Sequence, residues 1–396
     1  MEFHESMIAF HESSLAFHNS IPKTERAEAG IYFTPKKVRD KLFHALPAVL
    51  NQNMCRPIRI LSEPIRILEP SFGSGEFLRD VLERFPGAQV VGVENHPELF
   101  GKTKENLSAL PDLFCQDFLE WSHPQSFDLI LGNPPYFSCK KKSPALTGRA
   151  NAYVLFLYKC LTQHLSPDGI LAFVLPTSLY NSSFYQPMRD LLFQKTILHL
   201  ETLVKPGFHD TTQETMLLVL QNKPGKGDYF FQDKYLTPYW KELTLLVQNT
   251  TTLSQLGLGV KTGNIVWNQH KESLTDEGTL LVYSSNIKDG KLVYPPLKLP
   301  KKQYIQSDKP ALDGPVLLVE RGYGNSYHFH FALVDLKGFY AENHINVIYP
   351  ITPDAFKNLS KVAASFQDPR TKQFIQQFVG NGALSAGELE RFPVFI

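Results

Sequence analysis

The fold is decided by the stretch Phe127-Asp128-Leu129-Ile130-Leu131-Gly132-Asn133-Pro134-Pro135-Tyr136. Its apolar half predicts a buried strand of a parallel α/β sheet, which ends at a stiff polar corner. In such sheets ligands bind outside the carboxyl ends of the strands. The two prolines remove N–H donors and leave carbonyl oxygens free, while Asn133 adds an acceptor and Tyr136 adds an aromatic face. This set suits an amino group carried on a planar ring.

A strand, a tight glycine turn and a helix are predicted from Ile65 to Leu78. Gly73 and Gly75 let the backbone approach a ligand closely. Glu69, at the end of the strand, would repel a pyrophosphate but attract the ammonium and sulfonium groups of S-adenosylmethionine. A second strand ends at Glu94, at the spacing expected of an acid that binds the two hydroxyls of a ribose.

The corner sequence Asn133-Pro134-Pro135-Tyr136 resembles the catalytic motif of the S-adenosylmethionine-dependent amino-methyltransferases. Thr34-Pro35, which precedes the glycine turn, makes the order similar to the gamma class, which includes the TaqI-like N6-adenine DNA methyltransferases of restriction-modification type. The resemblance covers residues 24–222 and implies a Rossmann-like methyltransferase domain. It implies that the four corner residues are catalytic and that S-adenosylmethionine is the cofactor.

The same resemblance implies which residues bind the cofactor: Thr34, Glu69, Pro70, Ser71, Gly73, Gly75, Glu94, Asp117, Phe118 and Phe156. It implies that Asp117 hydrogen-bonds the amino group of the cofactor's adenine and that Phe118 packs on the face of that ring. It also implies that Phe208 is a second aromatic partner, beside Tyr136, for the target base. Independently, the pattern predicts a helix from Lys36 to Leu46 with Thr34 as its N-cap.

The composition indicates an intracellular protein of two domains. The chain has 396 residues, 43% of them apolar, and a net charge of +1, so a DNA-binding surface must be a local concentration of cations. Four scattered cysteines favour a reducing cytoplasm and speak against a zinc site or disulfides. We expect no metal, no membrane segment and a soluble, cytoplasmic protein.

Three parts of the chain are expected. A seven-residue repeat that begins Phe3-His4-Glu5-Ser6 predicts an amphipathic helix over residues 1–23. Residues 24–224 form the catalytic domain, which the breaker-rich stretch 222–228 closes. Residues 225–396 form a mixed α+β target-recognition domain with helices over 356–366 and 371–379. We expect a monomer or a weak dimer.

Cations gather directly after the corner. Lys140, Lys141, Lys142 and Arg149 are expected to contact the phosphates of DNA, although a solvated surface loop is the competing interpretation. In the second domain, five residues could touch bases, and ordinary surface loops explain them equally well: Gly263, Asn264, Trp267, Asn268 and Arg321.

The sequence thus predicts a site-specific methyltransferase that acts on the N6 amino group of a flipped-out adenine in double-stranded DNA. A cognate restriction endonuclease, if one exists, is a separate chain. Three alternatives stay open: a cytosine-N4 DNA or an RNA amino-methyltransferase, a protein-glutamine methyltransferase, and a non-catalytic DNA-binding subunit.

Overall fold

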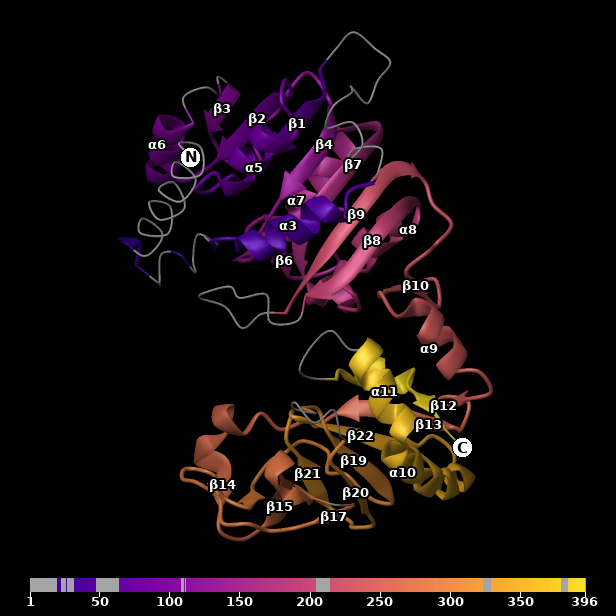
Figure 1. The fold of residues 1–396 in the computed structure, drawn as a ribbon. Coiled ribbons are helices and arrows are strands. Elements are labelled where there is room, and N and C mark those ends of the chain that lie inside the picture. The colour runs from indigo at the N-terminus through magenta and orange to yellow at the C-terminus, as the bar shows by residue number, and fades with distance from the viewer. Residues whose placement is uncertain are drawn as a thin grey trace. The chain divides into compact units, whose positions relative to one another are not determined.

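The computed structural model describes residues 20–22, 26, 32–47, 64–107, 110, 112–203, 214–288, 290–322, 329–378 and 384–395. The chain divides into two compact units, Met1–Trp240 and Lys241–Ile396, which run from indigo to pink and from orange to yellow in Figure 1. Residues 1–19 of the predicted N-terminal helix lie outside the described residues, as does Phe208.

The first unit is built on a seven-stranded sheet (Figure 1). Its strands, in spatial order, are β3 (Asp112–Cys115), β2 (Gln89–Glu94), β1 (Arg66–Glu69), β4 (Phe127–Gly132), β7 (Leu165–Pro176), β9 (Thr215–Pro224) and β8 (Lys195–Leu203). The first five run parallel, and β9 runs antiparallel to both of its neighbours. The predicted α/β class and the buried strand that ends at the corner are therefore confirmed.

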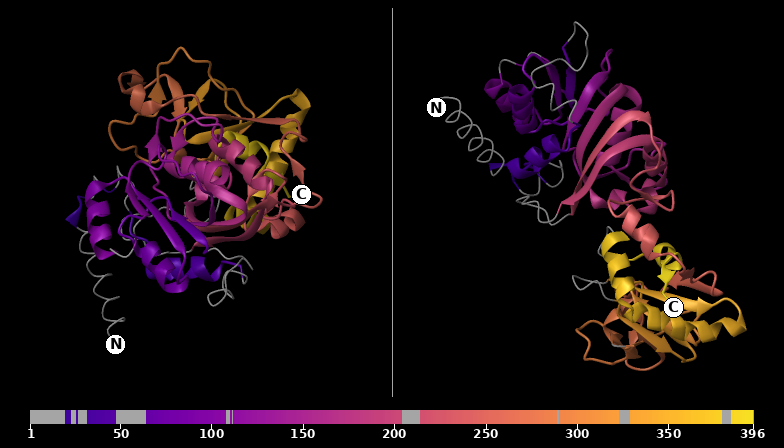
Figure 2. Two further views of the ribbon diagram at one scale, coloured as in Figure 1. Left: turned by 90° about the horizontal axis from the view of Figure 1, so that it is seen from above. Right: turned by 45° about the vertical axis from the view of Figure 1, so that its right-hand side comes forward.

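Helices cover both faces of this sheet (Figure 2). Helices α3 (Lys36–His44) and α5 (Glu76–Arg84) pack on one face, and α7 (Ala152–Lys159) and α8 (Gln186–Phe193) pack on the other. Successive residues of a strand point to opposite faces. Phe173 therefore packs on the face covered by α7 and α8, and Val174 packs on the face covered by α3 and α5. Burial on both faces explains why β4, and β7 from Ile170 onward, are almost continuously apolar.

The start of α3 differs from the prediction. The helix begins at Lys36, Pro35 occupies the N-cap position, and no side chain caps the first turn. Thr34 is therefore not the cap. Its hydroxyl instead accepts a hydrogen bond from the Asn133 amide at 3.0 Å. Because the hydroxyl points toward that amide, it does not accept from a backbone N–H of the first helical turn.

The boundary between the units also lies later than predicted. Residues 225–240, which we assigned to the second domain, pack on the first unit. The ring of Phe230 lies 5.1 Å from that of Phe193, and the Leu236 N–H donates to the Tyr180 carbonyl at 3.0 Å. The breaker residues near Pro224 thus mark a turn back onto the same core.

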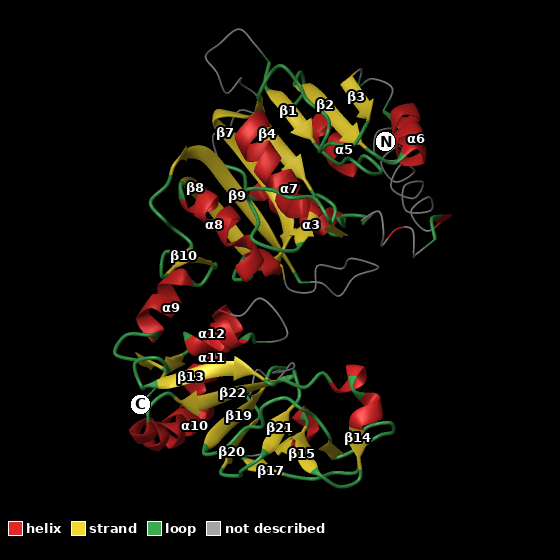
Figure 3. Cartoon of the chain, turned by 180° about the vertical axis from the view of Figure 1, so that it is seen from behind, coloured by secondary structure: helices red, strands yellow, loops and turns green. Residues whose placement is uncertain are grey.

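The second unit mixes strands and helices, as predicted (Figure 3). One antiparallel sheet contains β13 (Leu258–Thr262), β22 (Ile345–Pro350), β19 (Val316–Glu320) and β20 (Phe331–Val334). A second sheet contains β14 (Leu274–Thr275), β18 (Tyr304–Ile305), β15 (Thr279–Val282) and β21 (Phe339–Ala341). The two predicted helices are present as α10 (Leu359–Gln367) and α11 (Pro369–Phe378).

No described helix is long and apolar enough to cross a membrane. Within the residues that the structure describes, no group of three or more His, Cys, Asp or Glu side chains could hold a metal ion.

Candidate active site

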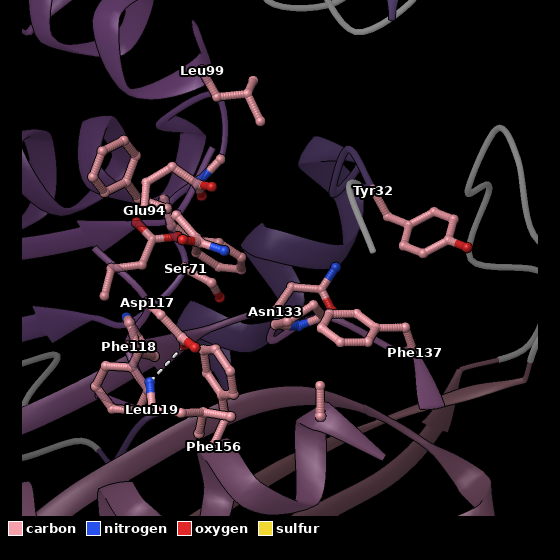
Figure 4. Close-up of a pocket in the computed structure, with 18 of the residues that line it drawn as sticks. Tyr32, Ser71, Glu94, Leu99, Asp117, Phe118, Leu119, Asn133, Phe137 and Phe156 are labelled. Carbon is pink, nitrogen blue, oxygen red and sulfur yellow. Dashed lines mark hydrogen bonds between the residues drawn. The ribbon is translucent and has the colours of Figure 1, made fainter. Parts of the chain in front are cut away.

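A pocket of the first unit lies at the carboxyl ends of β1, β2 and β4 (Figure 4). It brings together most of the residues predicted to bind the cofactor, and two from the corner: Thr34, Glu69, Pro70, Ser71, Gly73, Glu94, Asp117, Phe118, Phe156, Asn133 and Pro135. Gly75 does not line this pocket. Residues far apart in the sequence thus meet at the edge where the parallel strands end.

The glycine turn has the left-handed backbone that its sequence predicts. Gly73 has a φ of +54° and Gly75 a φ of +82°, directly before α5. A Cβ on Gly75 would lie 2.6 Å from Cγ2 of Thr103, on helix α6 (Pro97–Asn106). Gly75 therefore serves the packing of α6 on this turn, whereas Gly73 faces the pocket.

Glu94 fixes the same turn from the neighbouring strand. Its Oε2 accepts a hydrogen bond from the Gly73 N–H at 2.9 Å, and its Oε1 accepts one from the His96 N–H at 2.7 Å. Burial raises the pKa of Glu94, and these two donors oppose that rise. The carboxylate is oriented by the backbone and keeps lone pairs for the hydroxyls of a ribose.

Glu69 is a buried carboxylate with an unsatisfied oxygen. The residue is 2% exposed, and its Oε2 has no hydrogen-bond partner among the described residues. Burial raises its pKa well above the ordinary value, and the nearby carboxylates of Glu76, Glu94 and Asp80 add to the effect. A cation in the pocket would relieve this cost. The sulfonium and ammonium of S-adenosylmethionine fit that requirement.

Another part of the pocket offers an acid and two aromatic rings. Asp117 Oδ1 accepts from the Leu119 N–H at 2.9 Å, a bond drawn in Figure 4. The rings of Phe118 and Phe156 lie 4.9 Å apart. This arrangement offers an acceptor for an amino group and apolar surface for a purine.

Lys159 on α7 was missed by the sequence analysis. Its buried ammonium donates to the carbonyls of Phe118 at 2.8 Å and Leu119 at 2.9 Å, and to that of Trp121. It thereby holds the turn that presents Asp117. A lysine in an apolar helix gives no sequence signal for a bond made about 40 residues away.

Lys141 departs from its predicted role. Its ammonium pairs with Glu120 at 2.8 Å and with Asp117 at 3.2 Å, and the Glu120 hydrogen bond raises its pKa. Lys141 also lines the pocket, so its ammonium lies beside these two acids. Lys140, Lys142 and Arg149 are exposed and form no ion pair within the described residues, so these three keep the proposed role at phosphates.

The corner Asn133–Tyr136 is held by a chain of hydrogen bonds. Asn133 Nδ2 donates to Thr34 Oγ1 at 3.0 Å, while its Oδ1 accepts from the Tyr136 hydroxyl. That hydroxyl also lies 2.9 Å from the Val174 carbonyl, and burial raises its pKa, so it stays protonated. The amide of Asn133 consequently has one orientation, with its oxygen on the side of Tyr136.

A buried ion pair supports Thr34 from behind. Arg39 Nε lies 2.6 Å from Asp80 Oδ2, and Arg39 Nη1 donates to the Thr34 carbonyl at 2.6 Å. Removing one partner of a buried pair leaves an uncompensated charge, which costs about 3–5 kcal/mol. The position of Thr34, and through it that of Asn133, is therefore strongly determined.

Tyr32 faces Tyr136 across the corner. The two ring centroids lie 6.2 Å apart with 27° between the ring planes, and Tyr32 also lines the pocket (Figure 4). The sequence analysis passed over Tyr32 because it precedes the Thr34-Pro35 motif. An aromatic residue next to that motif was the available signal.

The parallel sheet and the pocket at its edge, with an unpaired buried carboxylate, fit an S-adenosylmethionine-dependent methyltransferase. The model of the Eco57I restriction-modification methylase family matches residues 82–206. The chain is 34% identical over 387 residues to the modification methylase CviBIII of Paramecium bursaria Chlorella virus NC1A. The aligned region covers 95% of this chain and 96% of that protein.

Two further relatives are similar to the chain. The type II methyltransferase M.CvrRI of Paramecium bursaria Chlorella virus XZ-6E is 30% identical over 392 residues, 95% of this chain and 96% of that protein. A tRNA1(Val) (adenine(37)-N6)-methyltransferase of Glaesserella parasuis serovar 5 is 30% identical over 119 residues, 28% of this chain and 51% of that protein. The chain belongs to the type II DNA methyltransferases of the restriction-modification methylase family, whose methyl donor is S-adenosylmethionine.

The substitution Glu69→Gln tests the role of the buried carboxylate, because it removes the charge and keeps the shape. We expect the affinity for S-adenosylmethionine to fall roughly ten- to a hundredfold, since a hydrogen bond to a charged group contributes about 1.5–3 kcal/mol. Isothermal titration calorimetry measures this change. Glu105→Gln, on the exposed side of α6, is the matched control.

The same variant should alter the pH dependence of stability. A raised pKa in the folded state means that the contribution of Glu69 to stability is complete below its unfolded-state pKa and is lost as the pH rises through its folded-state pKa. The cofactor-free wild type should therefore lose thermal stability relative to Glu69→Gln between acidic and neutral pH. Parallel melting curves against pH would contradict this interpretation.

Thr34→Val tests whether the hydroxyl of Thr34 acts through Asn133. Valine keeps the shape but leaves Asn133 Nδ2 without its acceptor, so we expect kcat to fall roughly tenfold or more. The KM for S-adenosylmethionine should change little. Thr34→Ser, which keeps the hydroxyl, should restore most of the rate. A rise confined to that KM would instead assign the hydroxyl to the cofactor.

Proposed function

We propose that this DNA methyltransferase transfers the methyl group of S-adenosylmethionine to the N6 amino group of an adenine swung out of the duplex. The observation that carries the proposal is the fixed amide of Asn133, which lines the cofactor pocket and has its oxygen on the side of Tyr136. The name of the adenine-N6 relative supports adenine as the target base. The full-length similarity to two modification methylases supports DNA over RNA.

The residues of the corner would act by positioning and electrostatics. Adenine's amino lone pair is delocalised into the ring, so the amine is a poor nucleophile. Acceptors at Asn133 Oδ1 and the Pro134 carbonyl would hold its two hydrogens and stabilise the positive charge that develops on nitrogen. Bound S-adenosylmethionine supplies a methyl group already activated on a sulfonium. The amine loses its proton after the C–N bond has formed, so no base of tuned pKa is required.

Tyr32 and Tyr136 would replace the stacking that the base loses when it leaves the duplex. The rings lie 6.2 Å apart at 27°, so a base can enter between them only if one ring moves away. Tyr32 is the ring that can move, because it is partly exposed. Tyr136 is less free to move, because its hydroxyl is bonded to the Val174 carbonyl.

The remaining parts of the proposal concern the whole chain. Residues of the first unit would carry catalysis, and the second unit would choose the DNA sequence. We propose a monomer or weak dimer that works beside a separate cognate restriction endonuclease. Cytosine-N4 is the second candidate target, because the corner accepts any amine on a planar ring.

Asn133→Ala removes the oriented acceptor. We expect methyl transfer to fall by at least about a hundredfold, as for the loss of one preorganised hydrogen bond to a developing charge, while the protein stays folded. Chromatography and mass spectrometry of nucleosides from DNA treated with wild-type enzyme should give N6-methyldeoxyadenosine. N4-methyldeoxycytidine would overturn the adenine assignment, and near wild-type turnover of the variant would refute the role of Asn133.

Tyr32→Ala tests the aromatic slot. Loss of one stacking surface should raise the KM for DNA roughly tenfold or more, since a base–aromatic stack contributes about 1–3 kcal/mol. Tyr32→Phe should restore it, and the affinity for cofactor should change little. Tyr239→Ala, at an exposed tyrosine of the first unit, is the control. An unchanged KM in Tyr32→Ala would return the second stacking position to Phe208, the partner that the sequence predicts.

A further inference from the structure

A loop of the second unit, residues 291–300, presents large apolar side chains to solvent. Leu299 has 89% of its surface exposed and Tyr294 has 56%. Leu299 is the most exposed of the large hydrophobic side chains in the described part of the chain. Its neighbour Leu297, in contrast, packs on the core of the unit. The loop therefore has an inner side that anchors it and an outer side without a packing partner.

The backbone of this loop is held at both ends. Asn286, which is fully buried, donates from Nδ2 to the Val293 carbonyl at 2.9 Å, and its own carbonyl accepts from the Val293 N–H at 2.7 Å. At the other end, the Tyr283 hydroxyl donates to the Lys302 carbonyl at 2.8 Å. Three prolines between these anchors restrict φ: Pro295, Pro296 and Pro300. A backbone fixed in this way loses little conformational entropy on binding.

Positive charge is concentrated on the same segment. Residues 288–302 contain five lysines and one aspartate, a net charge of +4 in a chain whose total is +1. Lys301 is engaged over the rings of Trp267 and Tyr283, at 4.8 and 4.6 Å from their centroids. Lys302 pairs with Asp276 at 2.7 Å.

Two lysines of the outer side are available to a partner. Lys291 and Lys298 are exposed and form no ion pair with any described residue. Lys291 precedes Tyr294 by three positions, and Lys298 directly precedes Leu299, so exposed cations and exposed apolar side chains alternate along the loop. A partner that fits this loop must therefore offer negative charge beside apolar surface.

Two of the polar residues that the sequence singled out in this unit donate hydrogen bonds within it. Arg321 donates to the carbonyls of Asn343 at 3.1 Å and Leu384 at 3.3 Å. Asn264 donates to the Pro310 carbonyl at 3.1 Å, and the ring of Trp267 makes a cation–π contact with the Lys301 ammonium. Arg321 is thus a poor candidate for reading guanine, and the loop is the better candidate for contact with the substrate.

We propose that residues 291–300 contact duplex DNA, with Lys291 and Lys298 on phosphates and Leu299 entering a groove as an apolar wedge. Duplex DNA has the required chemistry, because the apolar faces of its stacked bases lie between two rows of phosphates and become accessible where a wedge opens a base step. Leucine and proline wedges enter the minor groove of DNA, and phosphate contacts position a protein on it. This inference rests on duplex DNA being the substrate of the chain.

The test compares two variants of the full-length protein with matched controls. Lys291→Gln/Lys298→Gln should lower the slope of log affinity against log salt by about 1.8, because each phosphate contact contributes about 0.9. Leu299→Ser should weaken binding to duplex by roughly tenfold, the effect of exposing a buried leucine, and leave that slope unchanged. Fluorescence anisotropy with specific and random duplexes measures both.

The controls alter exposed residues elsewhere in the second unit. Lys361→Gln/Lys372→Gln removes the same charge, and Ile351→Ser removes a side chain that is 62% exposed. Both controls should bind DNA with the wild-type affinity and salt slope. If the loop variants also bind as the wild type does, the inference is overturned, and the loop serves some other partner. A wild type that binds duplex but methylates no adenine would refute the proposed function instead.

Discussion

The catalytic corner depends on the hydrogen bond between Asn133 Nδ2 and Thr34 Oγ1, which joins residues 99 positions apart. An asparagine amide has a donor end and an acceptor end of nearly the same shape, and only its partners decide which end faces the substrate. Thr34 takes the donor end, so the oxygen lies beside Tyr136. The ion pair of Arg39 with Asp80 holds Thr34 in place, which extends this constraint into helices α3 and α5.

A second constraint is the unbalanced negative charge of the cofactor pocket. Three carboxylates lie close together there, those of Glu69, Glu76 and Glu94, and burial raises the pKa of the first and the last. A protein that folds around such a group sacrifices stability unless a cation binds. The pocket is thus built for a positively charged ligand, and the turn at Gly73 that shapes it is fixed by one of the same carboxylates.

The sequence predicted what local patterns determine. Apolar runs located β1, β2, β4 and β7, and the glycine turn and the proline corner located the pocket. It did not predict contacts that the tertiary fold creates, such as the three carbonyls bound by Lys159. It also misjudged Thr34, because a threonine before a proline resembles a helix cap whatever its hydroxyl bonds to. The proline and glycine residues near Pro224 likewise resembled an interdomain linker, because only tertiary packing shows that the chain turns back onto the first unit.

The central claim, that Thr34 acts on the reaction through Asn133, is tested most directly by a double-mutant cycle on the single-turnover rate of methyl transfer. The variants are Thr34→Val, Asn133→Ala and the two combined. If the claim holds, the double variant should be no slower than Asn133→Ala alone, because without the amide Thr34 has nothing left to orient. Two effects that add independently in the double variant would contradict it.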